Sequence, residues 1–235
     1  MKPEPEKRVQ FLDGWRGAAV LVMLGWHLCW DLASYGCFSR RVMFSPLAGL
    51  ARMFIVFSFV LLSGISCRYS RDNVRRGIKT LLCALAVSAA MWYIGDPIWF
   101  GILHLLGICM CLYGLLGERF EKLPPAATAR VCMVLFTVFL VIVDRVRVSF
   151  PGMWMFGLRT AAFYSADYYP LFPWMFLFLT GTVVGGKLRA GGGRAFPLPS
   201  PGWLRFFGRH ALLIYMLHQP VLMGILYLVF GCFPG

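Results

Sequence analysis

The stretch from Phe11 to Tyr35 limits most strongly what this chain can fold into. It is an apolar run long enough for a membrane-crossing helix, yet it contains His27 and Asp31 well inside it. A charged side chain at the centre of a membrane helix costs about 2.5 to 3.5 kcal/mol, so it normally faces a protein interior or a wet cavity. Because His27 and Asp31 are four residues apart, they share one helix face. We predict a functional pair in which Asp31 fixes the tautomer of the imidazole; the alternative is a pair that only joins helices together.

The composition is that of an integral membrane protein. Of 235 residues, 59% are hydrophobic and only 14% are charged, which leaves too little charge for a water-facing surface. Seven apolar segments come close to the roughly 20 residues that a helix needs to cross a bilayer: 17–38, 46–67, 77–95, 98–117, 129–143, 170–186 and 210–230. We expect an all-α, polytopic membrane helix bundle of about seven transmembrane helices that forms a single domain over 1–235. In the second segment, Gly64 and its neighbouring serines predict close helix packing.

The basic excess is explained by membrane topology. The net charge is +13, and with a cytoplasmic N-terminus and seven crossings, 17 of the 23 Lys and Arg lie on the inner side. This distribution follows the positive-inside rule, so the expected partner is the lipid bilayer and not a nucleic acid. The eight cysteines lack the spacing of metal ligands, and we predict no metal site.

Basic residues gather where the segments meet the inner side. Asp13 and Arg16 are three residues apart at this border, where they either pair or leave Arg16 for an anionic ligand. The segment 68–79, RYSRDNVRRGIK, either fixes the topology or holds phosphates. Arg209 and His210 lie at the inner entrance of the last segment. The loop 187–203 is rich in Gly and Pro, and we expect it to be flexible.

Fewer polar residues are expected toward the outer side. His104 is predicted about two turns inside its segment, at a depth similar to that of His27, although a lone histidine is more often a structural residue. The outer loop 144–169 offers Asp167 to a substrate, and Tyr168 and Trp174 are typical of the interfacial aromatic belt. His218 lies about two turns into the last segment, beside Gln219 and Pro220.

Five motifs, in order along the chain, resemble those of a known family: LDGWRGAAVLVMLGWHLCWDL, SFVLLSGISCRYSR, WFGILHLLGICM, DYYPLFPWMFLFLTGTVVG and FGRHALLIYMLHQPVL. The family is a bacterial membrane family related to the catalytic domain of heparan-alpha-glucosaminide N-acetyltransferase, within the transmembrane acyltransferase superfamily. The resemblance implies an acyltransferase of the bacterial cytoplasmic (inner) membrane. Its acetyl group would come from acetyl-coenzyme A (acetyl-CoA) on the cytoplasmic side and pass to an amine or hydroxyl of a sugar-like acceptor on the outer side.

The resemblance also suggests roles for the residues singled out above. His27, oriented by Asp31, would be the general base or nucleophile, and His104 would polarise the carbonyl or orient the acceptor. The phosphates of acetyl-CoA would meet a basic set on the inner side: Arg16, Arg75, Arg76, Lys79, Arg209 and His210. The acceptor would meet an outer set: Asp167, Tyr168, Trp174 and His218.

Two other classes of function fit some of these features. In a proton-coupled transporter the same His and Asp residues would form a relay, although no inverted repeat is visible in the sequence. A structural subunit of an envelope complex would leave the buried His and Asp unexplained. A homodimer is compatible with the sequence.

Overall fold

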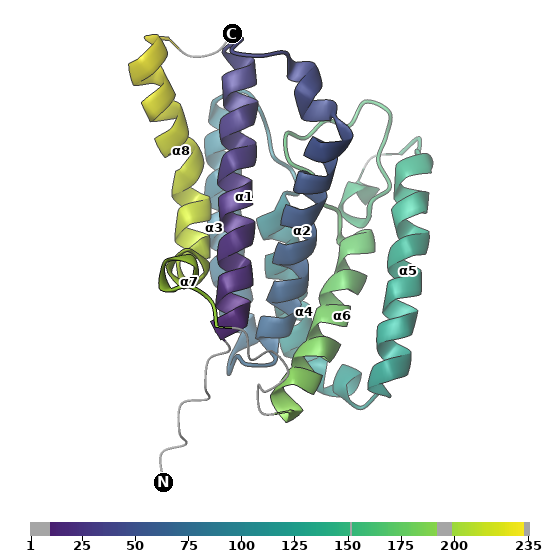
Figure 1. Ribbon diagram of the computed structural model, residues 1–235. Helices are drawn as coiled ribbons and strands as arrows, with labels where there is room; N and C mark the ends of the chain where they lie inside the picture. Colours follow the sequence, from purple (N-terminus) through teal and green to yellow (C-terminus); the bar gives the residue numbers. More distant parts are fainter. Residues whose placement is uncertain (1–9, 151, 192–198, 233–235) are drawn as a thin grey trace. The chain divides into compact units, whose positions relative to one another are not determined.

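The computed structural model of the protein describes residues 10–150, 152–191 and 199–232, and within them it is all-helical (Figure 1). These residues form eight α-helices and two 3-10 helices and no strand, as expected. The elements are α1 (Gln10–Ser34), η1 (Arg40–Phe44), α2 (Pro46–Cys67), α3 (Asn73–Tyr93), α4 (Ile102–Glu121), α5 (Pro125–Arg145), η2 (Met153–Phe156), α6 (Leu171–Ala190), α7 (Gly202–Arg209) and α8 (Ala211–Phe230).

The seven predicted membrane segments correspond to α1 to α6 and α8. By length and composition, six of these helices can cross a membrane. The exception is α3, because its first two turns contain Arg75, Arg76 and Lys79 and lower its mean hydropathy. The fifth segment, predicted as the shortest, is a full 21-residue helix from Pro125 to Arg145. The chain is therefore a multi-pass membrane helix bundle.

The helices group into two compact units. Unit 1 contains α1, η1, the first part of α2 (46–59), α7 and α8. Unit 2 contains the remainder of α2 (60–67), α3 to α6 and η2. The expectation of a single domain stays a prediction, and the two units are described separately below.

Unit 1 is built on α1, which packs against both α7 and α8. The backbones of α1 and α7 come so close that only glycine fits at their contact. A Cβ on Gly17 would collide with the carbonyl oxygen of Leu204, and one on Gly208 would collide with that of Asp13. The first part of α2 joins α1 through a hydrogen bond from the Trp15 indole nitrogen to the buried Ser58 hydroxyl, at 3.0 Å.

The helix α7 was not expected from the sequence. The predicted flexible loop ran to residue 203, but residues 202 to 209 form two helical turns. The part of that loop at 192–198 lies outside the described residues. Eight residues form no stable helix alone, so the glycine contacts with α1 are what hold α7 in place.

Unit 2 consists of helix pairs held by small residues. α3 packs on α4, α5 packs on α6, and α4 also contacts α6. The prediction for the second segment is confirmed at Gly64, where a Cβ would collide with the carbonyl oxygen of Phe178 in α6. Facing it, Gly181 and Gly185 of α6 lie against the α2 backbone. The largest fully buried side chains of this unit include Phe178, Phe100, Leu105, Leu177 and Leu62.

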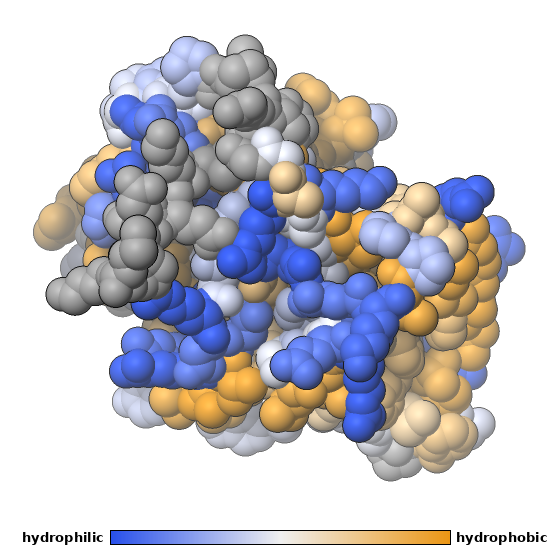
Figure 2. Space-filling view, turned by 90° about the horizontal axis from the view of Figure 1, so that it is seen from below, coloured by the Kyte–Doolittle hydropathy of each residue, from blue (hydrophilic) through white to orange (hydrophobic). Residues whose placement is uncertain are grey.

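The outward faces of the helices are apolar where lipid would cover them. On α5 the exposed side chains include Val134, Val138 and Val141, as expected for a helix whose surroundings are hydrocarbon. In unit 2, α3 and α5 start, and α4 and α6 end, at the lower end of Figure 1. The view from that end shows hydrophilic side chains gathered there (Figure 2).

The glycine contact of unit 1 can be tested with two substitutions in the same helix. Gly17→Ala forces α7 away from α1, and overpacking of this kind costs about 1 to 3 kcal/mol, so we expect a lower midpoint of thermal unfolding in detergent. Gly25→Ala is the matched control, because no atom lies within 4 Å of a Cβ at that position. Equal midpoints for the two variants would contradict the proposed contact.

Candidate active site

In unit 1, α1 and α8 bring two histidines into contact within the apolar helices. The ring centroids of His27 and His218 are 4.7 Å apart, with the rings at 62° in an edge-to-face arrangement. His27 lies seven residues before the end of α1, about 10 Å along the helix axis. His218, which the sequence predicted as a substrate contact, is thus a direct neighbour of the predicted catalytic histidine.

The partner of Asp31 is not the one we expected. Both carboxylate oxygens of Asp31 accept hydrogen bonds from the amide nitrogen of Gln219, each at 3.0 Å. Among the described residues Asp31 forms no hydrogen bond to His27. The reason is that α8 packs on the face of α1 that carries both residues, and its amide reaches the carboxylate. Asp31 is 5% exposed, so the amide replaces the water that the carboxylate loses.

His218 is oriented by its own helix. Its Nδ1 atom lies 2.6 Å from the backbone carbonyl oxygen of Tyr215, and its ring packs against the Tyr215 ring with centroids 5.5 Å apart. Above the histidines, Tyr35 stacks on Phe230 and donates a hydrogen bond to the Cys232 carbonyl oxygen at 2.9 Å. The C-terminal ends of α1 and α8 are therefore joined in unit 1.

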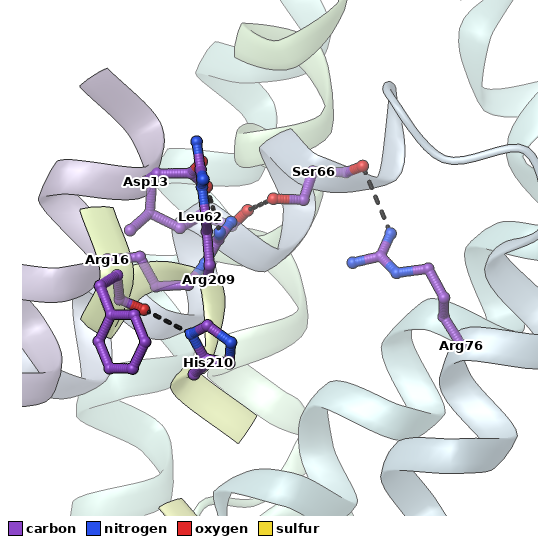
Figure 3. A network of polar contacts seen from close by, with 8 residues as sticks. Asp13, Arg16, Leu62, Ser66, Arg76, Arg209 and His210 are labelled. Atoms are coloured by element: carbon purple, nitrogen blue, oxygen red, sulfur yellow. Dashed lines mark hydrogen bonds and ion pairs between the residues drawn. The ribbon is translucent and has the colours of Figure 1, made fainter. Parts of the chain in front are cut away.

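At the N-terminal end of α1 in unit 1, Asp13 holds two arginines (Figure 3). The Asp13 carboxylate is buried; it accepts from Arg16 at 3.3 Å and pairs with Arg209 of α7 at 3.5 Å. Of the two readings of Asp13 and Arg16, the ion pair is the one that the structure contains. The contact with Asp13 engages Nε of Arg209, and a guanidinium carries five N–H groups, so Arg209 has others. Nearby, His210 is exposed and its Nδ1 atom lies 2.9 Å from the Phe206 carbonyl oxygen.

At the end of unit 2 where α3 begins, the basic residues of α3 divide into two kinds. Arg76 is tied down by the backbone oxygen of Ser66 at 3.4 Å (Figure 3) and by the Asn73 side chain at 3.3 Å. Arg75 and Lys79 are both exposed and are four residues apart, so they lie on one helix face. This face is where an anion in the aqueous phase can reach both cations.

At the same end of unit 2, a polar network that was not predicted from the sequence surrounds Arg68. Arg68 forms an ion pair with Glu121 and donates to the Tyr113 hydroxyl at 3.1 Å, while that hydroxyl donates to Glu121 at 2.7 Å. Arg189 of α6 donates to the Arg68 carbonyl oxygen at 2.9 Å. These contacts join α2, α4 and α6, and the sequence gives no sign of them because the partners are far apart in the chain.

His104 lies shallower than expected. α4 begins at residue 102, so His104 is in the first turn and not two turns inside. The residues before it are extended: Tyr169 donates to the Phe100 carbonyl oxygen at 2.9 Å, which keeps 98–101 out of the helix. His104 Nδ1 accepts from the backbone N–H of Gly101 at 3.2 Å, and Nε2 lies 3.5 Å from the Ser88 hydroxyl. Both ring nitrogens thus have partners within the fold.

The three predicted outer substrate contacts of unit 2 are also engaged in the fold. The Asp167 carboxylate accepts from the backbone N–H of Ile102 at 3.1 Å, at the positive N-terminus of α4. The Tyr168 hydroxyl donates to the Trp154 carbonyl oxygen at 2.5 Å. Trp174, predicted for the aromatic belt, is 7% exposed and packs edge-on against Phe136. Their roles toward a substrate stay predictions.

Comparison with known proteins gives one match. The family model described as "Heparan-alpha-glucosaminide N-acetyltransferase, catalytic" matches residues 8–220. The chain belongs to this family. The match spans most of the chain and includes His27, Asp31, His218 and Gln219. No curated protein and no solved structure matches the chain.

Membership of this acetyltransferase family sets the class of chemistry for the site. It indicates a membrane acetyltransferase, and the residues that the structure brings together in unit 1 are of the types that acyl transfer needs. Among the described residues, no group of three or more His, Cys, Asp and Glu side chains is placed to hold a metal ion.

The surroundings of Tyr168, in the segment between α5 and α6, predict a pH effect that can be measured. Burial raises the pKa of Tyr168 from 10.0 to about 12, although Arg159 and Arg147 act in the opposite direction. An unfolded tyrosine loses its proton near pH 10, so the folded state is the one that keeps the proton between pH 10 and 12. This group's contribution to the free energy of unfolding is therefore complete below pH 10 and is lost as the pH rises toward 12.

The measurement is a titration of tyrosinate absorbance for the native chain and for Tyr168→Phe. The difference between the two curves should be one tyrosine that ionises near pH 12. A difference curve centred near pH 10 would show that Tyr168 is not held in the folded loop.

Proposed function

We propose that the protein transfers an acetyl group from acetyl-CoA on the cytoplasmic side of a bacterial inner membrane to a sugar-like acceptor on the outer side. The observation that carries the proposal is the contact between His27 and His218 within the apolar helices of a chain from an acetyltransferase family. Packing alone gives no reason to place two imidazoles there, because apolar side chains would fill the same space without the cost of burying polar atoms.

In the proposed reaction, the two histidines supply the base. An amine or hydroxyl of the acceptor attacks the thioester carbonyl carbon and gives its proton to an imidazole. The carbon–sulfur bond breaks, and the thiolate of coenzyme A leaves with the bonding electrons and takes up that proton. The apolar surroundings of the pair support this role, because they keep away the water that would hydrolyse the thioester.

The donor would be bound at the inner side through its phosphates. In unit 2, the exposed pair of Arg75 and Lys79 suits a polyanionic nucleotide, because neither side chain lies inside the fold. In unit 1, Arg209 keeps N–H groups beyond the one that faces Asp13, and His210, the next residue, is exposed. This assignment requires a cytoplasmic N-terminus, which the distribution of Lys and Arg supports.

Donor binding can be tested by calorimetry on the detergent-purified protein. We expect acetyl-CoA to bind with a dissociation constant in the micromolar to millimolar range usual for enzyme substrates. Arg75→Ala with Lys79→Ala should weaken binding at least roughly tenfold, because hydrogen bonds to charged groups contribute about 1.5 to 3 kcal/mol each. Arg40→Ala with Arg41→Ala is the control, since these exposed arginines belong to η1 on the expected outer side.

If the folded protein binds no acetyl-CoA, the proposal fails. Uptake of a solute by the protein in liposomes without any coenzyme A would then support the proton-coupled transporter.

The chemical step can be tested by removing both imidazoles. The double variant His27→Ala with His218→Ala should transfer labelled acetyl groups from acetyl-CoA to a glucosaminide at a rate lower by about 10² to 10⁴, the usual contribution of a general base. Acetyl-CoA binding by the same variant should be unchanged. A double variant that transfers acetyl groups at the native rate would remove the histidines from the mechanism.

A further inference from the structure

In unit 1, α8 contains two neighbouring side chains that each have a buried polar atom without a partner among the described residues. These atoms are Nε2 of His218 and Oε1 of Gln219. A buried polar atom left without a hydrogen bond costs about 1 to 3 kcal/mol, so each one needs an explanation. Because the two residues are adjacent and both contact α1 at the His27 and Asp31 positions, one explanation can serve for both.

The hydrogen bond of His218 decides which ring nitrogen carries a proton. Its Nδ1 atom is 2.6 Å from the Tyr215 carbonyl oxygen, and a carbonyl oxygen only accepts hydrogen bonds. Nδ1 must therefore be the protonated nitrogen, which leaves Nε2 of the neutral ring with a lone pair. His218 is 9% exposed, so this lone pair is directed into the protein and not toward bulk water.

The hydrogen bonds of Gln219 fix its amide in the same way. The nitrogen lies 3.0 Å from both oxygens of Asp31, and an ionised carboxylate only accepts. The amide cannot turn over without placing its oxygen against the carboxylate. Asp31 therefore holds Oε1 of Gln219 as an acceptor that faces away from the carboxylate. His218 and Gln219 together offer two acceptors and no donor on these atoms.

We infer that His218 Nε2 takes the proton from the acceptor substrate, while Gln219 Oε1 accepts a second hydrogen from that substrate and holds its reacting group in place. This inference rests on the proposed function and assigns separate roles within the same site. Asp31 is then a positioning residue that acts through Gln219, and not the residue that orients His27. His27 is a positioning residue as well, through the contact of its ring with the His218 ring at 4.7 Å.

The inference limits which acceptors can react. The reacting group, or the group next to it, must donate two hydrogens: one to His218 Nε2 and one to Gln219 Oε1. A primary amine, or a hydroxyl beside a second hydroxyl, satisfies both atoms. A lone hydroxyl or a secondary amine leaves one acceptor buried and unpaired. Sites of this kind reject the deficient substrate strongly, because the unpaired group costs free energy in the complex.

The proton transfer keeps atoms and electrons in balance. As the acceptor nitrogen or oxygen bonds to the acetyl carbon, its proton moves to His218 Nε2 and makes the ring a cation. The carbon–sulfur bond breaks, and the thiolate receives that proton from Nε2. The other proton stays on Nδ1 throughout, where it is hydrogen-bonded to the Tyr215 carbonyl oxygen. Among the described titratable groups, His27 on α1 and Tyr215 on α8 contact the His218 ring, and Asp31 on α1 binds the neighbouring Gln219.

The first test needs no acceptor. NMR on protein with isotope-labelled histidine nitrogens, with His218→Asn used to assign the signal, reports which nitrogen of His218 carries the proton. We expect the proton on Nδ1 near neutral pH. A proton on Nε2 in the neutral ring would overturn the inference, whatever the outcome of the activity measurements.

The second test separates the two histidines by their pH profiles. His218→Asn removes Nε2 and keeps an amide in the region of Nδ1; we expect acetyl transfer to a glucosaminide to fall by about 10² or more and to lose its rise with pH. His27→Asn should lower the rate of acetyl transfer, and that rate should still rise with pH. Val221→Ala, at an exposed position on the same helix, is the control for correct folding. Loss of the rise in His27→Asn but not in His218→Asn would overturn the inference.

The third measurement concerns the positioning by Gln219. Gln219→Leu with Asp31→Leu removes Oε1 at similar size and leaves no buried carboxylate without donors, so we expect the KM for a primary-amine acceptor to rise by about tenfold, with a smaller effect on a lone alcohol. A KM unchanged for the amine would contradict the role of Gln219. Acetyl-CoA binding is measured by calorimetry for the native protein and for every variant. If the native protein binds no acetyl-CoA, the proposed function fails. If the native protein binds acetyl-CoA and the His218→Asn variant still transfers acetyl groups at the native rate, only the present inference fails.

Discussion

The hydrogen bonds between Asp31 and Gln219 are the interaction on which the rest of the candidate site depends. An ionised carboxylate within an apolar helix needs donors from the protein, since hydrocarbon supplies none. The amide of Gln219 supplies them to both oxygens at 3.0 Å, which fixes the rotation of α8 relative to α1. With that rotation set, the preceding residue of α8, His218, meets His27 one turn before Asp31 on α1. The histidine contact is thus a consequence of the carboxylate–amide pairing.

The contact between α1 and α7 in unit 1 depends on a different constraint, which is how closely two backbones can approach. Gly17 and Gly208 bring α7 against α1, and this places Arg209 within reach of the buried Asp13. The glycines of the DGWRG motif therefore serve packing, while its charged residues hold the docked helix. Because α7 leads directly into α8, the position of α7 also sets where α8 begins along α1. The same close approach recurs in unit 2, where Gly64 meets α6.

The sequence predicted the parts of the fold that depend on local composition. Runs of about 20 apolar residues located all seven long helices, because the bilayer thickness sets that length. The helix α7 was missed because eight residues beside a Gly- and Pro-rich stretch give no such signal, and its stability comes from contact with α1. The start of α4 was misplaced because the extended pairing of residues 98–101 with the outer loop is a tertiary contact. For the site, helical spacing placed His27 and Asp31 on one face, but it could not reveal that α8 would bring Gln219 to Asp31.

The hydrogen bonds of His104, His210 and His218 separate structural roles from chemical ones more clearly than their depth in the membrane does. His104 is near the outer end of its helix, with its two ring nitrogens engaged by Gly101 and Ser88, so moving a proton there would break a cap. His210 is exposed at a helix junction, where water can satisfy its second nitrogen. His218 alone among the described histidines combines one committed nitrogen with one that is buried and without a partner. A histidine in that state can exchange a proton without disturbing the hydrogen bond that orients it, which is the requirement for a base that must be regenerated in every cycle. The apolar segments of the sequence locate the helices that carry such residues. Only the hydrogen-bond partners in the fold show which of these residues has a polar atom left for the substrate.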